Sequence, residues 1–162
     1  MEEDSMTVSG AGHTRPDPAE CLCPGDQSRV FFMAFSDTDL IYMRRVLDLA
    51  RKGRGRVSPN PMVGCVIVRG NQVLGEGWHE GPGLPHAEVN AVKACPDENI
   101  QGATVYVNLE PCAHFGKTPP CADFLAERQP ARVVCAMKDP NPLVSGRGID
   151  RLRQAGIQVD CG

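Results

Sequence analysis

The sequence predicts an α/β domain, a three-layer α-β-α sandwich around a mixed, mostly five-stranded sheet. Apolar residues follow helical spacing in some segments and form short β-rich runs in others, in the order α-β-β-α-β-α-β-α-β. A Gly70-Asn71 turn joins the first two strands, and so short a turn makes them antiparallel. Helices then separate the later strands. This order predicts a mixed sheet with helices on both of its faces.

The first element is a helix with a recognisable start and end. Ser36, followed three residues later by Asp39, forms a capping box, and Gly53 ends the helix. Its apolar face carries Leu40, Met43, Leu47 and Ala50. The later elements are expected as strands 62–69 and 72–78, helix 86–95, strand 103–109, helix 121–128, strand 131–137, helix 149–154 and strand 157–160.

Composition excludes several classes of protein. The net charge is -3, and no block of Lys or Arg runs along any segment, so a surface for binding nucleic acid is not expected. The longest apolar run, 62–68, already contains Gly64 and is far too short to span a membrane. The acidic start has no apolar core and resembles neither a secretory signal nor a transit peptide. We therefore expect a cytoplasmic protein.

Residues 1–32 differ in composition from the rest of the chain. They are rich in Gly, Pro, Ser and acidic residues and show no sustained hydrophobic period, so they are expected to form a disordered leader. Residues 33–162 are then expected to form the folded domain, and Met33 is a candidate for its natural start.

The eight cysteines are expected to be reduced, because disulfides are rare in cytosolic chains of this size. Cys65 and Cys135 lie inside apolar runs and are typical of small core residues, and Cys95 is expected to pack at the end of a helix. Only Cys112 and Cys121 stand where the hydrophobic pattern breaks.

These two cysteines and His86 form a candidate metal site. His86 follows Pro85 at the start of a helix, Cys112 follows a buried strand, and Cys121 opens the next helix. Helix N-termini favour anions, so both thiolates are expected to be supported electrostatically. Two thiolates and one imidazole suit zinc, and three protein ligands leave a fourth position for water, as in catalytic zinc sites.

Glu88 lies two residues after His86 and is not needed as a ligand, so it can move protons beside that water. Taken singly, His86 with Glu88 could be a solvated surface pair, and a cysteine after a strand could be core. Their joint occurrence favours the zinc site. A phosphate loop at 116–118 is excluded, because Pro111 occupies the place of the first glycine that such a loop needs.

H-x-E, then P-C, then a second cysteine is the signature of zinc-dependent nucleobase deaminases. The usual gap between their cysteines is two residues, whereas eight separate Cys112 from Cys121. The segments PNPMVGCVIV, HAEVNA, LEPCAHFGKTPPC and AMKDPNPLVSGRG closely resemble the deaminase domain of the bifunctional riboflavin-biosynthesis deaminase/reductase. The resemblance covers residues 37–162 and implies a cytidine-deaminase-like fold.

The resemblance also implies a reaction. The family removes the 2-amino group of 2,5-diamino-6-(5-phosphoribosylamino)pyrimidin-4(3H)-one by hydrolysis, giving 5-amino-6-(5-phosphoribosylamino)uracil and ammonia. It would use one zinc ion per chain, with Glu88 moving the protons. The implied substrate contacts are Asn60, His79, His114, Lys117, Asp139 and Asn141. Turn capping is the alternative for Asp139 and Asn141, and a plain surface position is the alternative for His79.

Many members of this family carry a following reductase domain that uses NADPH. This chain stops about where that domain would begin, so we expect no NADP on this chain alone, with the reductase either supplied separately or missing from a fragment. Relatives suggest a homo-oligomer. Two other functions stay open: a zinc deaminase acting on guanine or dCMP, and a non-catalytic zinc-stabilised module. Glu88 favours catalysis, because a structural zinc has no use for a carboxylate beside an open position.

Overall fold

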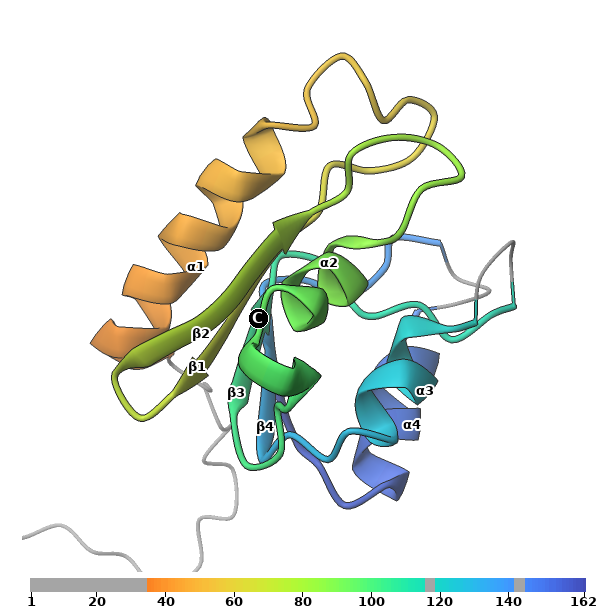
Figure 1. Cartoon of the computed structure of the whole chain (residues 1–162). Helices are drawn as coiled ribbons and strands as arrows, with labels where there is room; N and C mark the ends of the chain where they lie inside the picture. Colours follow the sequence, from red (N-terminus) through yellow and green to blue (C-terminus); the bar gives the residue numbers. More distant parts are fainter. Residues whose placement is uncertain (1–34, 116–118, 142–144) are drawn as a thin grey trace, which may run out of the picture. The chain divides into compact units, whose positions relative to one another are not determined.

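The computed structural model describes residues 35–115, 119–141 and 145–162. The expected leader over residues 1–32 and the predicted substrate contact Lys117 lie outside the described residues. The elements in chain order are α1 (Asp37–Arg51), β1 (Gly64–Arg69), β2 (Gln72–Trp78), α2 (Ala87–Lys93), the 3-10 turn η1 (Pro96–Glu98), β3 (Thr104–Val107), α3 (Cys121–Ala126), β4 (Arg132–Cys135), α4 (Arg147–Gln154) and β5 (Gln158–Cys161) (Figure 1). The predicted order is confirmed, and η1 is the one addition.

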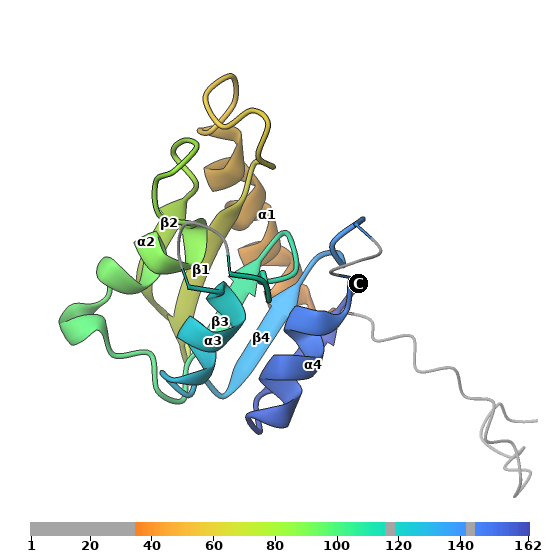
Figure 2. The same cartoon turned by 90° about the vertical axis from the view of Figure 1, so that its right-hand side faces the viewer.

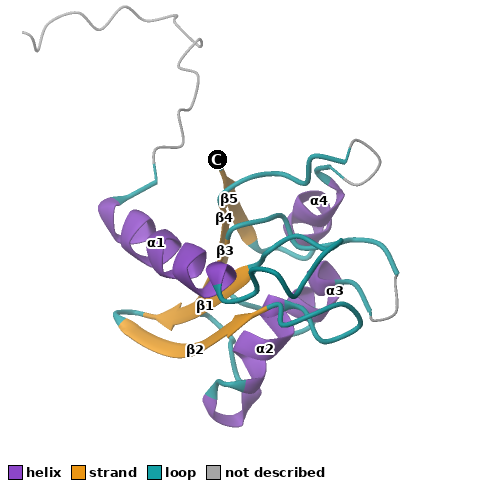
Figure 3. Ribbon diagram, turned by 90° about the horizontal axis from the view of Figure 1, so that it is seen from above, coloured by secondary structure: helices purple, strands orange, loops and turns teal. Residues whose placement is uncertain are grey.

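The five strands form one mixed sheet in the order β2-β1-β3-β4-β5. β1 pairs antiparallel with both β2 and β3, whereas β3, β4 and β5 are mutually parallel. Figure 3 shows α1 on one face of this sheet and α2, α3 and α4 on the other. The three-layer sandwich predicted from the sequence is therefore confirmed. Among the described residues no helix has the length and apolar character needed to cross a membrane.

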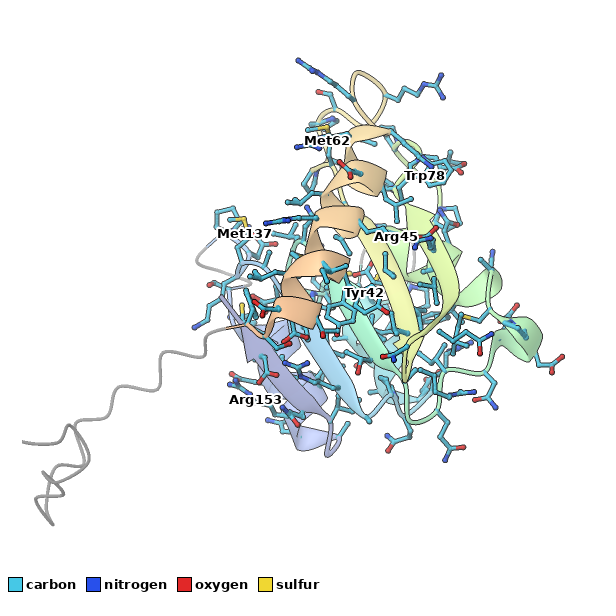
Figure 4. All side chains as sticks on the ribbon, turned by 90° about the vertical axis from the view of Figure 1, so that its left-hand side faces the viewer. Tyr42, Arg45, Met62, Trp78, Met137 and Arg153 are labelled. Atoms are coloured by element: carbon cyan, nitrogen blue, oxygen red, sulfur yellow. The ribbon has the colours of Figure 1, made fainter. Side chains whose placement is uncertain are left out.

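Alternate side chains of each strand fill the two layers of the core. Val66, Tyr106 and Val134 face α1 and pack with its buried residues Met43, Val46 and Leu49. The opposite side chains, among them Cys65, Ile67, Val105, Val133 and Cys135, pack against α2, α3 and α4. The predicted core positions of Cys65, Cys95 and Cys135 are confirmed, since all three are buried. Tyr42 of α1, labelled in Figure 4, adds a ring contact to Tyr106 with centroids 5.1 Å apart.

The pairing register brings one end of each of the strands β1, β2, β3 and β4 to the same edge of the sheet. Gly64, which begins β1, lies opposite Trp78, which ends β2. The next residue of β1, Cys65, pairs with Val107 at the end of β3, and Val107 pairs with Cys135 at the end of β4. Segments that leave β2, β3 and β4, and the segment that enters β1, therefore meet at this edge. Ligand sites of α/β proteins lie at such carboxyl ends.

A buried ionic network lies at the other end of the sheet. The predicted capping box is present, with the Ser36 hydroxyl accepting from the Asp39 N–H and the Asp39 carboxylate accepting from the Ser36 N–H. The same carboxylate accepts from the Tyr106 hydroxyl at 2.9 Å and from the Arg132 guanidinium at 2.7 Å. Arg132 also donates to Asp160 at 2.5 Å. Asp39 thus joins the start of α1 to Tyr106 in β3 and to Arg132, the first residue of β4.

Replacing Asp39 should test how much this network stabilises the fold. Burial acts to raise the pKa of Asp39, but hydrogen bonds from Arg132, Ser36 and Tyr106 outweigh it and hold the pKa well below its usual range. Asp39→Asn should lower the free energy of unfolding by about 3–5 kcal/mol at neutral pH, because it leaves a partly buried guanidinium short of a partner. Urea unfolding measures this loss. Asp48→Asn, at an exposed carboxylate that pairs with Arg51, is the control and should cost less than about 1 kcal/mol.

The same network gives a pH dependence with a definite sign. Because the folded-state pKa of Asp39 lies below its unfolded value, the unfolded state binds more protons, and stability rises with pH. The Asp39 contribution is complete above the usual carboxyl pKa of about 4 and is lost as the pH falls toward the folded-state pKa. The difference in stability between wild type and Asp39→Asn should therefore shrink in acid. A constant difference between pH 7 and pH 3 would contradict this account.

Candidate metal centre and its pocket

A cavity of about 200 Å³ opens at the carboxyl edge of the sheet. Its walls come from the segments that meet there: the one before β1, the ones that follow β2 and β3, and the one that follows β4. The lining residues are Asn60, Pro61, Val63, His79, His86, Glu88, Leu109, Glu110, Cys112, His114 and Asp139. Seven of the residues singled out in the sequence are in this list, although up to 79 positions separate them along the chain.

The three candidate ligands come together at this cavity. Nδ1 of His86 lies 3.2 Å from Sγ of Cys121 and 3.6 Å from Sγ of Cys112, and the three donor atoms all lie within 4.8 Å of one another. Zinc-sulfur bonds of about 2.3 Å and zinc-nitrogen bonds of about 2.0–2.1 Å in a tetrahedron separate such atoms by about 3.5 Å. Both cysteines are free thiols. The donor set and its spacing fit a zinc ion, and they assign Nδ1 as the imidazole donor.

Helix starts position two of these three residues. His86 is the N-cap of α2, with an extended backbone, and Cys121 is the first residue of α3, directly after Pro120. Cys112 follows β3, as predicted, but no helix begins there, because residues 111–115 are irregular. Instead, the Cys121 N–H at the beginning of α3 donates to Sγ of Cys112 at 3.3 Å. One helix N-terminus therefore supports both sulfurs.

Glycine in β2 allows α2 to come close enough to place His86. A Cβ atom on Gly77 would lie 2.4 Å from the backbone nitrogen of Ala91 and 2.6 Å from the carbonyl oxygen of Ala87, both in α2. Any larger residue at this position would push the helix off the sheet. The Asn90 side chain adds a hydrogen bond of 2.9 Å to the carbonyl of Trp78, at the end of β2.

The two thiols are electrostatically unequal. The hydrogen bond from Cys121, aided by His86, lowers the pKa of Cys112 to about 4. The same pairing, together with burial, raises the pKa of Cys121 well above its usual range. The hydrogen bond with Cys112 also raises the pKa of His86. One sulfur of the pair is thus ready to carry negative charge, which suits a bound cation.

Glu88 stands beside this cluster as a buried carboxyl group. It is only 3 % exposed, and burial raises the pKa of its side chain. The nearby Cys121 side chain acts to lower this pKa, and among the described residues Glu88 forms no ion pair with Lys or Arg. A carboxyl group buried without a basic partner needs a proton or a metal ion nearby. This position suits a group that takes up and releases protons.

Among the predicted substrate contacts, Asn60 and His79 are linked. Nδ1 of His79 lies 3.1 Å from the carbonyl oxygen of Pro85, and its Nε2 lies 3.0 Å from Nδ2 of Asn60. A carbonyl can only accept, so Nδ1 carries the proton and Nε2 accepts from the Asn60 amide. His79 is 3 % exposed, which makes the surface alternative wrong. Both of its nitrogens are occupied, and among the described residues no donor reaches the side-chain oxygen of Asn60, which is left for a ligand.

The remaining predicted contacts divide into three groups. His114 and Asp139 line the cavity. Asn141 is exposed and lies outside that lining; its N–H donates to Oδ1 of Asp139 at 2.8 Å, which is the turn-capping arrangement weighed as an alternative. Lys117 lies outside the described residues.

Two further residues near the strand ends hold the site together and were not predicted from the sequence. The Asn108 side chain accepts from the Gly64 N–H at 2.8 Å and donates to the carbonyl of Met62 at 3.0 Å, so it holds the entry to β1. Glu110 lines the cavity and is 5 % exposed. A charged residue directly after a buried strand, in LEPC, was the available signal, because a carboxylate at such a place needs several hydrogen bonds.

Comparisons with known proteins agree with this geometry. The family model described as cytidine and deoxycytidylate deaminase zinc-binding region matches residues 36–137. Riboflavin biosynthesis protein RibD of Actinobacillus pleuropneumoniae is 56% identical over 122 residues, which are 75% of this chain and 32% of the relative. RibD of Escherichia coli (strain K12) is 55% identical over 124 residues, 76% of this chain and 34% of the relative. The chain thus spans about a third of the length of these relatives.

Solved structures lead to the same conclusion. Acinetobacter baumannii RibD superimposes with a TM-score of 0.74 at 51% identity, covering 76% of this chain and 35% of that one. A diaminohydroxyphosphoribosylaminopyrimidine deaminase/5-amino-6-(5-phosphoribosylamino)uracil reductase from Thermotoga maritima gives a TM-score of 0.72 at 44% identity, over 76% and 36% of the two chains. The predicted resemblance is confirmed. Because the family model matches most of the folded domain, the chain belongs to the cytidine and deoxycytidylate deaminase zinc-binding family.

Proposed function

We propose that this chain is the deaminase of riboflavin biosynthesis that converts 2,5-diamino-6-(5-phosphoribosylamino)pyrimidin-4(3H)-one to 5-amino-6-(5-phosphoribosylamino)uracil and ammonia. The observation that carries the proposal is the buried Glu88 carboxyl group beside the cluster of His86, Cys112 and Cys121 in a cavity. The identity of 44% to the Thermotoga maritima protein, whose name includes this deaminase activity, supports the substrate.

His86, Cys112 and Cys121 would hold one zinc ion per chain. When bound, zinc makes water available as a nucleophile at neutral pH. The Glu88 carboxylate accepts a proton from the attacking water at one of its oxygens. It donates this proton to the ring nitrogen of the pyrimidine. It then takes the remaining proton of the added hydroxyl group and donates it to the amino group, which leaves as ammonia. Burial of Glu88 keeps bulk water away from these transfers.

Asn60 would recognise the substrate as a hydrogen-bond acceptor. Its amide nitrogen donates to His79, so its carbonyl oxygen is the group that a ligand can reach. Amino groups and protonated ring nitrogens of a diaminopyrimidine donate hydrogen bonds and suit this oxygen. His79 then acts through Asn60, while His114 and Asp139, which line the same cavity, would contact the substrate.

Ammonia release from four compounds tests the proposal: the phosphoribosylaminopyrimidine, cytidine, dCMP and guanine. We expect turnover of the first and at least about a hundredfold lower kcat/KM for the others, because each lacks hydrogen-bonding groups that the site is built to bind. Faster turnover of dCMP or guanine would assign the chain to another zinc deaminase. Zinc binding without release from any of the four would favour the non-catalytic module.

We also propose that the deaminase domain spans residues 33–162 and works as a homo-oligomer in the cytoplasm. The family match over residues 36–137, with β5 continuing to Cys161, supports these limits. A site built from two thiolates needs reduced cysteines, which a cytoplasmic location maintains. Sedimentation of the purified chain measures the state of assembly.

Lys117 is proposed to bind the phosphate of the substrate. It lies between Cys112 and Cys121, so a metal ion held by both would keep it near the cavity. Lys117→Ala should reduce kcat/KM by about 1.5–3 kcal/mol, as expected for a charge-assisted hydrogen bond. Lys138→Ala makes the same change at a main rival cation in the predicted site loops and should have the smaller effect. Equal losses for Lys117→Ala on the substrate and on its dephosphorylated analogue would move Lys117 from the phosphate to the pyrimidine or to the loop itself.

A further inference from the structure

We propose that Glu110 is a positioning residue, whose carboxylate holds Asp139 and the start of α4 in place against the cavity. Neither the metal cluster nor the proton transfers need Glu110, yet it is 5 % exposed at the edge of the site. The kinetic part of the proposal rests on the proposed function, and the structural part does not.

Four backbone N–H groups converge on this carboxylate. Oε2 accepts from Asp139 at 3.1 Å and from Gly146 at 2.9 Å. Oε1 accepts from Gly148 at 2.8 Å and from Ile149 at 3.4 Å. Within the described ranges Glu110 forms no ion pair with Lys or Arg. Among the described residues its negative charge is therefore stabilised by main-chain donors, which is how a carboxylate can be buried without a basic partner.

Two of these donors belong to the first turn of α4, which has no cap of its own. The N-cap residue is Gly146, with φ 84°, and it has no side chain that could accept the first N–H groups. Such groups need an acceptor, and a negative charge is favoured at a helix N-terminus. The Glu110 carboxylate supplies both the acceptor and the negative charge, from another part of the chain. Gly148 makes the approach possible, because a Cβ atom there would lie 1.9 Å from the carbonyl oxygen of Pro111.

Glu110 thereby couples two walls of the site. It lies two residues before Cys112, and its backbone N–H donates to the carbonyl of Met137 at 3.0 Å. Its side chain holds the N–H of Asp139, which lines the cavity. Figure 2 shows how α3 and α4 begin at the same end of the sheet, beyond β3 and β4. The Glu110 side chain thus sets the distance between Cys112, a candidate metal ligand, and Asp139, a predicted substrate contact.

If Glu110 only stabilised the fold, its replacement would have the same effects as the replacement of another buried carboxylate. Asp39 provides that comparison. It is also a buried carboxylate that accepts several hydrogen bonds, but it lies at the opposite end of the sheet. Glu110→Gln keeps the size of the side chain but places an NH2 group where two N–H groups now point. Asp39→Asn makes the matching change away from the site.

Hydrogen exchange measured by mass spectrometry on the zinc-loaded chain tests the structural part. Glu110→Gln should speed exchange in peptides covering residues 138–150 by at least about tenfold, with zinc content unchanged. Asp39→Asn, which lowers global stability, should speed exchange in these peptides no more than in the rest of the domain, whereas the acceleration in Glu110→Gln should be concentrated in them. Acceleration spread evenly over all peptides of Glu110→Gln, or none, would overturn the proposal. The hydrogen-exchange experiment tests the structural part of the proposal even if the chain deaminates none of the tested compounds.

Steady-state kinetics test the second part, at a temperature where both variants are folded. Glu110→Gln should raise KM about tenfold with a smaller change in kcat, because substrate contacts move while Glu88 and the metal ligands stay. Asp39→Asn should keep both constants within about twofold. An unchanged KM in Glu110→Gln would overturn the proposal. Glu110→Asp is the second variant if Glu110→Gln fails to fold, because it keeps the charge but shortens the side chain. It should show the same selective increase in exchange and in KM. Normal exchange and a normal KM in Glu110→Asp would overturn the proposal.

Discussion

Glu88→Gln should lower kcat by at least about a hundredfold while zinc content and fold are preserved. Glutamine has nearly the shape of glutamate but cannot accept a proton from water or pass it to the ring nitrogen, and such proton transfer is worth about 10²–10⁴ in rate. The side chain is 3 % exposed, so no bulk water can substitute for it. Ammonia release under saturating substrate measures kcat, and metal analysis of the same sample measures zinc.

Glu80→Gln is the matched control, because Glu80 is an exposed acid next to His79. It should leave kcat within about twofold of wild type, as expected for a surface change away from the chemistry. Near-normal turnover of Glu88→Gln would mean that another group carries the protons, with His114 the first to examine because it lines the same cavity.

Cys121→Ala should lose most of the bound zinc and a large part of the stability. The sulfur lies 3.2 Å from Nδ1 of His86, and its removal leaves one sulfur and one nitrogen to hold the metal. Structural zinc sites contribute about 10–16 kcal/mol of apparent binding free energy in small peptides, so the fold should respond to the loss of the metal. Metal analysis after gel filtration and thermal unfolding with and without added zinc measure the two effects.

A second buried cysteine separates metal binding from packing. Cys65 is fully buried in β1 but is not part of the metal cluster. Cys65→Ala should keep full zinc and cost about 1 kcal/mol of stability, since it removes one small apolar group from the core. Full zinc occupancy in Cys121→Ala would contradict the ligand assignment.

Element order could be predicted because its signals are local. The capping box at Ser36 and Asp39 needs only residues three apart, and β2 has the bounds predicted for it, Gln72–Trp78. The last helix was predicted to begin at Ile149 but begins at Arg147. Its first turn depends on a cap from Glu110, which lies 38 residues away from Gly148 in the chain, and no local pattern reports such a partner.

By itself the sequence predicted the fold class, the candidate metal donors and the proposed proton-carrying group, because helix starts, buried strands and soft ligands are properties of short segments. Tertiary structure alone decided which atoms of these residues face one another. The antiparallel pairing of β1 with β2 and β3 brings Trp78, Cys65 and Val107 to one edge, and this sets Asn60 against His79 and Glu110 against the start of α4. Long-range hydrogen bonds form only after the strands have paired, so the orientation of Asn60, the tautomer of His79 and the role of Glu110 could be read only from the folded chain.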